Sequence, residues 1–149
     1  MYRVNLYTYV SSRGFGEGDC AAGYVLECIS VPDENPVADP LADIEILHGV
    51  TRQQSELQVL IRALKRMRRP SDIEIFTESA YVADGILRWS RQWRENNWKR
   101  SDGTAISNQR EWQELVELAE PHNYSFHLKE PHKFTEWLKT ETVRRLKKG

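Results

Sequence analysis

Residues 43–77 read DIEILHGVTRQQSELQVLIRALKRMRRPSDIEIFT. Apolar and polar side chains alternate over 43–50, which is typical of a half-buried strand. Apolar positions then recur at helical spacing up to Pro70, and residues 73–77 form a short β-prone run. A strand, a helix and a strand in this order normally make a right-handed crossover with the two strands parallel. The stretch therefore predicts an α/β fold with a mixed sheet.

The helix in this stretch has a recognisable start. Thr51-Arg52-Gln53-Gln54 matches a capping box, in which the Thr51 side chain accepts from an unpaired backbone N–H and the Gln54 side chain reaches back to the cap. Proline in the interior of a helix removes a hydrogen bond and clashes with the preceding turn. We therefore expect the helix to begin after Thr51 and to continue until Pro70 stops it.

Two more strands are predicted upstream. Residues 3–10 and 22–29 are short β-prone runs, and the segment 11–19 between them is rich in glycine and serine, which favours a turn between paired strands. Residues 31–41 contain three prolines and several acidic residues, which predicts an exposed acidic loop. A hairpin and a loop should therefore precede the strand at 43–50.

Further helices and one more strand are predicted downstream. Ser79 is a suitable cap for a helix that continues or bends toward Trp98, and Asn108 is a suitable cap for the next one. Apolar residues alternate over 124–128, which predicts the last strand, and a final helix should extend to about Lys147. The expected architecture is a five-stranded mixed sheet flanked by helices.

Composition limits the class of protein. The chain has 149 residues, of which 40% are hydrophobic and 29% charged, so we expect a single globular domain over 1–149. No apolar run has the length of a membrane-spanning helix and no signal-peptide core is evident, which favours a cytoplasmic protein without membrane contact. Cys20 and Cys28 do not form a zinc or redox motif. The net charge of −1 means that any nucleic-acid binding must come from a local patch.

Several phrases, in order along almost the whole chain, resemble type I ribonuclease H. The phrase IFTESAYV at 75–82 resembles the family's T-D-S-x-Y-V element, with Glu78 where aspartate is expected. The other phrases are AAGYVL at 21–26, TRQQSEL at 51–57, GILRW at 85–89, and Trp93, Trp98-Lys99 and Trp112, which are similar to the bacterial form's basic protrusion and the helix after it. The resemblance implies a ribonuclease-H-like fold.

The resemblance also implies a chemistry. Members of this family hydrolyse the RNA strand of an RNA/DNA hybrid, using four carboxylates that hold two divalent ions. Mg²⁺ suits such a site because it takes hard oxygen ligands and keeps several waters, and Mn²⁺ is the other candidate. Paired ions can activate the attacking water and stabilise the leaving oxygen.

Three glutamates fall at family carboxylate positions, as candidates for both catalysis and metal binding. Glu56 matches the helix glutamate, and Glu78 stands in for an aspartate with one additional methylene. Counting without gaps from Lys129 brings Glu141 to the fourth position, whereas a small deletion in the following loop would bring Glu136 there instead.

The first strand departs from the family pattern. The family expects aspartate in the phrase T-D-G-S, and this chain offers Tyr9, with no acidic residue before Glu17. In the family that aspartate bridges both ions, and a neutral phenol is a poor substitute for a carboxylate. His132 falls near the loop where the family often has an assisting histidine, but Glu130-Pro131 replaces the usual glycine and shifts the register. Standard two-ion hydrolysis is therefore in question.

Cations interleaved with aromatic residues predict a nucleic-acid contact surface. We expect Trp89, Trp93 and Trp98 to pack and the cations around them to contact phosphates. The predicted nucleic-acid-binding residues are Arg88, Arg91, Arg94, Lys99 and Arg100, together with Arg52 and Gln54 at the helix start.

Three functions remain open from the sequence. The first is a ribonuclease-H-like protein that binds an RNA/DNA hybrid or duplex, with hydrolysis lost or strongly reduced because of Tyr9. The second is an active metal-dependent endoribonuclease with a non-standard ligand set, in which Glu17 is a possible recruit. The third is a fold reused for protein contact, through the acidic segment 33–43.

Overall fold

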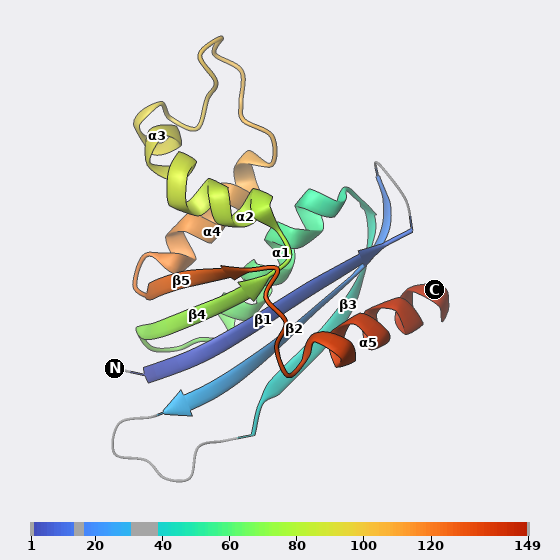
Figure 1. The fold of residues 1–149 in the computed structure, drawn as a ribbon. Coiled ribbons are helices and arrows are strands. Elements are labelled where there is room, and N and C mark those ends of the chain that lie inside the picture. The colour runs from blue at the N-terminus through green and yellow to red at the C-terminus, as the bar shows by residue number, and fades with distance from the viewer. Residues whose placement is uncertain (1, 14–16, 31–38, 149) are drawn as a thin grey trace.

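The computed structural model describes residues 2–13, 17–30 and 39–148. Five strands form one sheet in the order β3-β2-β1-β4-β5, which confirms the predicted mixed five-stranded sheet (Figure 1). Their bounds are β1 Tyr2–Ser12, β2 Gly18–Ser30, β3 Leu41–Val50, β4 Ser71–Thr77 and β5 Asn123–Leu128.

Strand β1 is the centre of the sheet. It pairs antiparallel with β2, where Tyr9 lies opposite Gly23, and parallel with β4, where Tyr7 lies opposite Phe76. Strand β5 then adds parallel to β4. Because β3 is antiparallel to β2, β3 and β4 run in the same direction, as the crossover predicted, although two strands lie between them.

Helices cover both faces of the sheet. One face carries the larger core, in which Leu57 and Leu60 of α1 pack with Trp112 and Leu115 of α4. Helix α5 lies across the opposite face (Figure 1), where Leu138 packs with Tyr7 and Val25. The helical segments are α1 Arg52–Lys65, α2 Ala80–Asp84, the π-helical turn η1 Gly85–Trp89, α3 Ser90–Glu95, α4 Gln109–Ala119 and α5 Thr135–Lys148.

Two glycines allow close packing. At Gly85 an added Cβ would lie 2.0 Å from the Trp112 ring, so η1 can sit on this buried tryptophan only without a side chain there. At Gly23 an added Cβ would lie 3.1 Å from both Ile44 and Leu138, so this glycine brings α5 close to the sheet.

Several helix boundaries differ from the predictions. Helix α1 ends at Lys65 instead of continuing to Pro70, because the N–H groups of Arg66 and Met67 bond three residues back, to Ala63 O and Leu64 O, in a tighter last turn. The helix after Ser79 passes through a π-helical turn and ends at Glu95, before Trp98. Asn108 precedes α4, but it has φ 59° and makes no cap hydrogen bond with its side chain.

Some predicted features lie outside the described part of the chain. The turn between β1 and β2 includes residues 14–16, and the acidic loop includes residues 31–38, and neither segment is described. Among the described helices, none has the length and apolarity to cross a membrane.

Candidate active site

Tyr9, Glu56 and Glu78 line one small hollow, together with Thr77. Strand β4 ends at Thr77, so Glu78 follows it directly. The last pair of the parallel strands β1 and β4 is Tyr7 with Phe76, and Tyr9 and Glu78 each lie two residues beyond this pair. Glu56 reaches the same place from the second turn of α1. The hollow measures about 10 Å³, room for roughly one water molecule.

Glu56 is the most buried of the candidate carboxylates. Its side chain is 13% exposed. Burial raises the pKa of the Glu56 carboxyl, because the charged form loses water, while a hydrogen bond with Ser79 and the nearby Arg52 lower it. Ser79 was predicted only as a helix cap, and it does accept from Val82 N at 3.1 Å. The sequence does not indicate the second contact of Ser79, its hydrogen bond with Glu56, because a helix-cap pattern carries no information about which other elements approach the cap.

Glu78 faces a more open space. It is exposed and lines a second hollow of about 80 Å³ with Lys129 and His132 of the loop before α5. Tyr9 lines this hollow too, and the residue that α5 contributes is its first one, Thr135. The two hollows therefore meet at Tyr9 and Glu78.

Glu141 does not line either hollow. It lies in the middle of α5, where its carboxylate accepts from Arg144 Nη2 at 2.5 Å. Glu136, its rival for the fourth carboxylate position, is exposed in the first turn of α5 and does not line them either. The structure thus brings Glu56 and Glu78 together with Tyr9, and leaves the fourth position a prediction.

These residues do not fit a two-ion site. Within the described ranges, no three His, Cys, Asp or Glu side chains are grouped so that they could hold a metal ion. Two carboxylate residues, Glu56 and Glu78, line the shared hollow, and the third position belongs to the uncharged Tyr9, whereas divalent ions such as Mg²⁺ need several hard oxygen ligands and compensating negative charge. Carboxylates are therefore missing at two of the four family positions, that of Tyr9 and the fourth one, which neither Glu136 nor Glu141 fills at these hollows.

The loop before α5 is held onto the sheet by aromatic and charged contacts. The ring of His132 lies 4.4 Å from that of Tyr7, and burial lowers the His132 pKa. Beneath it, Tyr7 donates to Glu27 Oε1 at 2.9 Å, and burial raises the pKa of Tyr7 to about 12. Lys133 pairs with Glu27 as well. His132 therefore helps to anchor the loop in this structure.

His127 of β5 forms a second anchor of the same loop. Its Nε2 lies 2.9 Å from Glu74 Oε2, its Nδ1 lies 2.6 Å from Glu130 Oε2, and its ring stacks on Phe76 with centroids 4.4 Å apart. The two carboxylates raise the His127 pKa, since they stabilise the charged ring. Glu130 in turn lines the 80 Å³ hollow.

Gln54 does not have the predicted geometry. Thr51 Oγ1 accepts from Gln54 N at 3.0 Å, so the first half of the capping box is confirmed. The Gln54 side chain instead donates to Glu111 Oε1 of α4 at 3.3 Å. The second half of the box is therefore wrong, because a tertiary partner takes the amide.

The predicted basic surface is present, but its arginines face acidic neighbours. Arg91 lies 3.7 Å from Glu95, and Arg94 lies 3.2 Å from Glu120.

Trp89 is 49% exposed, so the prediction that all three tryptophans pack is wrong for this one, whereas Trp93 and Trp98 pack against the core. Of the other predicted contacts, Arg88 faces Asp84, Arg100 donates to Ala105 O and Ser107 Oγ, and Lys99 is exposed.

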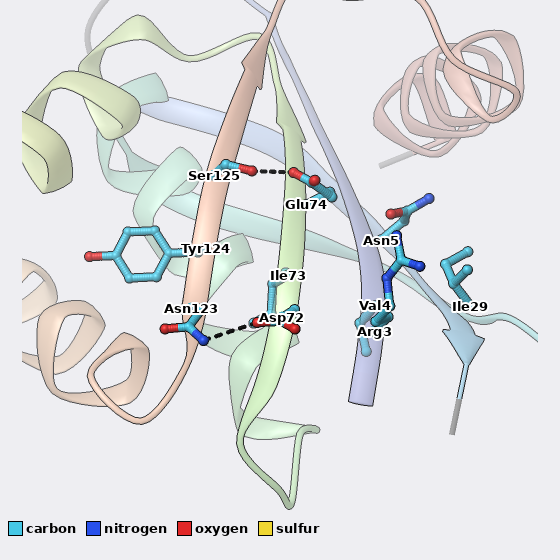
Figure 2. A pocket seen from close by; sticks show the side chains of 10 residues that line it. All are labelled: Arg3, Val4, Asn5, Ile29, Asp72, Ile73, Glu74, Asn123, Tyr124 and Ser125. Atoms are coloured by element: carbon cyan, nitrogen blue, oxygen red, sulfur yellow. Dashed lines mark hydrogen bonds between the residues drawn. The ribbon is translucent and has the colours of Figure 1, made fainter. Parts of the chain in front are cut away.

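A separate polar hollow opens at the other end of β1 and β4. Its two carboxylates have partners on the neighbouring strand: Asn123 donates to Asp72 at 3.0 Å, and Ser125 bonds to Glu74 (Figure 2). Because these groups already have partners within the sheet, this hollow does not compete with the carboxylate hollow as a candidate site.

Comparison with known proteins indicates the family of this chain. The RNase H family model matches residues 2–136. A ribonuclease H of Thiobacillus denitrificans is 39% identical over 74 residues, which cover 50% of this chain and 50% of that protein. This chain therefore spans about half the length of the first curated relatives that it matches.

Two solved structures share the fold. The crystal structure of LC9-RNase H1, a type 1 RNase H with the type 2 active-site motif, has a TM-score of 0.75 at 24% identity and covers 96% of this chain and 71% of that one. LC11-RNase H1 in complex with an RNA/DNA hybrid has a TM-score of 0.59 at 13% identity, covering 97% and 99%. The predicted ribonuclease-H-like fold is confirmed, and since the family model matches most of the chain, this protein belongs to the RNase H family.

Proposed function

We propose that this protein binds RNA/DNA hybrids or duplexes and that its metal-dependent hydrolysis is lost or strongly reduced. The observation that carries the proposal is Tyr9, which lines one hollow with Glu56 and Glu78. Tyr9 removes one of the four family carboxylates and neither Glu136 nor Glu141 lines the hollow, so two carboxylates converge there, too few for a two-ion mechanism with Mg²⁺ or Mn²⁺.

The nucleic-acid part of the proposal has independent support. The chain belongs to the RNase H family, and its structural neighbour LC11-RNase H1 was solved with an RNA/DNA hybrid. Arg88, Arg91 and Lys99 are exposed, as phosphate contacts must be. The acidic neighbours of the two arginines, Asp84 and Glu95, have side chains that are 49% and 69% exposed, and such pairs contribute little in water, so phosphates can replace them at small cost.

An active endoribonuclease with a non-standard ligand set is the second candidate. Glu56 and Glu78 do share a hollow, and the curated relatives are named ribonuclease H. In this alternative the two carboxylates hold at least one ion, with Tyr9 tolerated beside them.

Cleavage of a labelled RNA/DNA hybrid distinguishes the two functions. The parent, Tyr9→Asp and Glu56→Gln are compared with Mg²⁺ and then Mn²⁺, and hybrid binding is measured in the same preparations. We expect a parent that binds but does not cleave, and a gain of cleavage of at least about 100-fold in Tyr9→Asp, since one oriented ligand is worth that much. Metal-dependent cleavage by the parent that disappears in Glu56→Gln would favour the active enzyme.

A further inference from the structure

The guanidinium of Arg52 lies between β1 and Glu56. Arg52 is the first residue of α1, and its Nη2 donates to the carbonyl oxygen of Val10 at 3.1 Å. Its Nε lies 3.7 Å from Glu56 Oε2, one helical turn further on. The side chain thus connects the strand that carries Tyr9 to the most buried candidate carboxylate.

This pair differs from a surface pair of the same spacing. Arg91 and Glu95 on α3 are also four residues apart, with the same 3.7 Å between Nε and a carboxylate oxygen, but their side chains are 93% and 69% exposed. The Glu56 side chain is 13% exposed. A carboxylate with so little water needs a nearby positive charge, whereas an exposed one is served by solvent.

The two oxygens that Arg52 contacts are of the kind that a divalent cation would use. A backbone carbonyl and a carboxylate are hard oxygen ligands, typical of Mg²⁺ and Mn²⁺ sites. Next to Val10 the chain supplies Tyr9 in place of another anion. Arg52 also lines a hollow with Tyr9 and Val10, and these two residues line the carboxylate hollow as well, so the two hollows are neighbours.

We propose that Arg52 is an internal counter-cation of this site, whose guanidinium occupies Val10 O and Glu56 and thereby opposes binding of a divalent ion. The inference rests on the proposed function, for which it supplies a second cause of reduced hydrolysis beside Tyr9. Arg52 is a positioning residue here, and its earlier prediction as a phosphate contact becomes the competing interpretation.

Mn²⁺ affinity tests the proposal without any turnover. Mn²⁺ binding to the whole chain is measured by electron paramagnetic resonance for the parent, Arg52→Gln, Arg52→Lys and Arg91→Gln. We expect Arg52→Gln to bind Mn²⁺ at least about tenfold more tightly, because it removes a unit charge a few ångströms from the ion. Arg52→Lys keeps the charge and Arg91→Gln alters only the exposed pair, so both should bind as the parent does. Adding Glu56→Gln to Arg52→Gln should abolish the gain.

Unchanged or weaker Mn²⁺ binding in a folded Arg52→Gln variant would overturn the inference. Hybrid binding measured in EDTA separates this failure from that of the proposed function. If Arg52→Gln loses hybrid affinity and about one unit of salt slope while its Mn²⁺ affinity is unchanged, Arg52 is a phosphate contact. If the parent itself does not bind the hybrid, the proposed function fails, whatever the Mn²⁺ result.

Discussion

At the level of single residues, Tyr9 and Arg52 show what sequence can and cannot indicate. Comparison with a family motif was sufficient to identify Tyr9, because a motif position specifies a residue type. The contact of Arg52 with Val10 O had no such signal, since every residue has a backbone carbonyl and only the folded chain determines which one approaches. From the sequence, Arg52 is therefore predicted only as a nucleic-acid contact at the helix start, together with Gln54.

Glu141 illustrates a different limit. Its assignment depended on counting through the loop before α5, where one inserted or deleted residue moves every later position. In the structure the residue of α5 that reaches the hollow with Glu78 is Thr135, at the helix start, and Glu141 lies nearly two turns beyond it. Distance along a helix axis, which the count did not include, separates Glu141 from the other candidates.

His127 should make stability depend on pH. Its folded-state pKa is raised by Glu74 and Glu130, so the contribution of the charged ring is present in full below the usual value of about 6.5 and is lost as pH rises through the folded-state value. In thermal unfolding, we expect His127→Gln to be less stable than the parent by a larger margin at about pH 6 than at about pH 9.

His48 provides the matched control for this measurement. It also lies 2.9 Å from a carboxylate, that of Asp19, but its side chain is 73% exposed. His48→Gln should differ from the parent by about the same small margin at both pH values, since exposed pairs contribute little. Equal pH dependence in the two variants would contradict the role given to His127.

At the level of elements, the spacing of apolar residues predicted the strands and α1 well, and it predicted the region after β4 less well. Period-two and helical spacing arise from one buried face, which a single sequence displays directly. The π-helical turn η1 and the left-handed Asn108 have no such pattern. Asn108 donates to the Tyr81 hydroxyl at 3.1 Å, and Trp112 Nε1 donates to the same oxygen at 2.8 Å, so tertiary hydrogen bonds replaced the predicted cap.

The contact between η1 and α4 gives a test of packing. Gly85→Ala would place a methyl group 2.0 Å from the ring of Trp112, which is 1% exposed within the core. We expect a loss of at least about 2 kcal/mol in the free energy of unfolding, measured by urea denaturation. Gly18→Ala serves as the control, because an added Cβ there meets no atom within 4 Å. Similar midpoints for the two variants would refute the close approach.

At the level of the whole molecule, charge distribution matters more than total charge. The net charge is −1, so the protein has no overall attraction for a polyanion. If the exposed cations of η1 and α3 contact phosphates, the double variant Arg88→Gln/Arg91→Gln should weaken hybrid binding by about the same factor for every sequence and reduce the salt slope by about two. Fluorescence anisotropy over a salt series measures both.

A matched substitution elsewhere controls for loss of charge itself. Arg144 on α5 is exposed and faces a carboxylate, as Arg91 does, but it belongs to the helix on the other face of the sheet. Arg144→Gln should leave the salt slope unchanged. An equal effect of both changes would mean that binding responds to net charge and has no defined surface on η1 and α3.

The central position of β1 also bears on how the chain assembles. Its antiparallel partner β2 begins at Gly18, soon after β1 ends at Ser12, but Tyr7 meets Phe76 only after roughly 70 intervening positions, and closing so large a loop is entropically costly. During synthesis, one edge of β1 therefore has no partner strand until β4 has been translated. In this interval a nascent chain exposes an unpaired hydrophobic edge to chaperones and to neighbouring chains, so pauses in translation between β3 and β4 should affect the yield of folded protein.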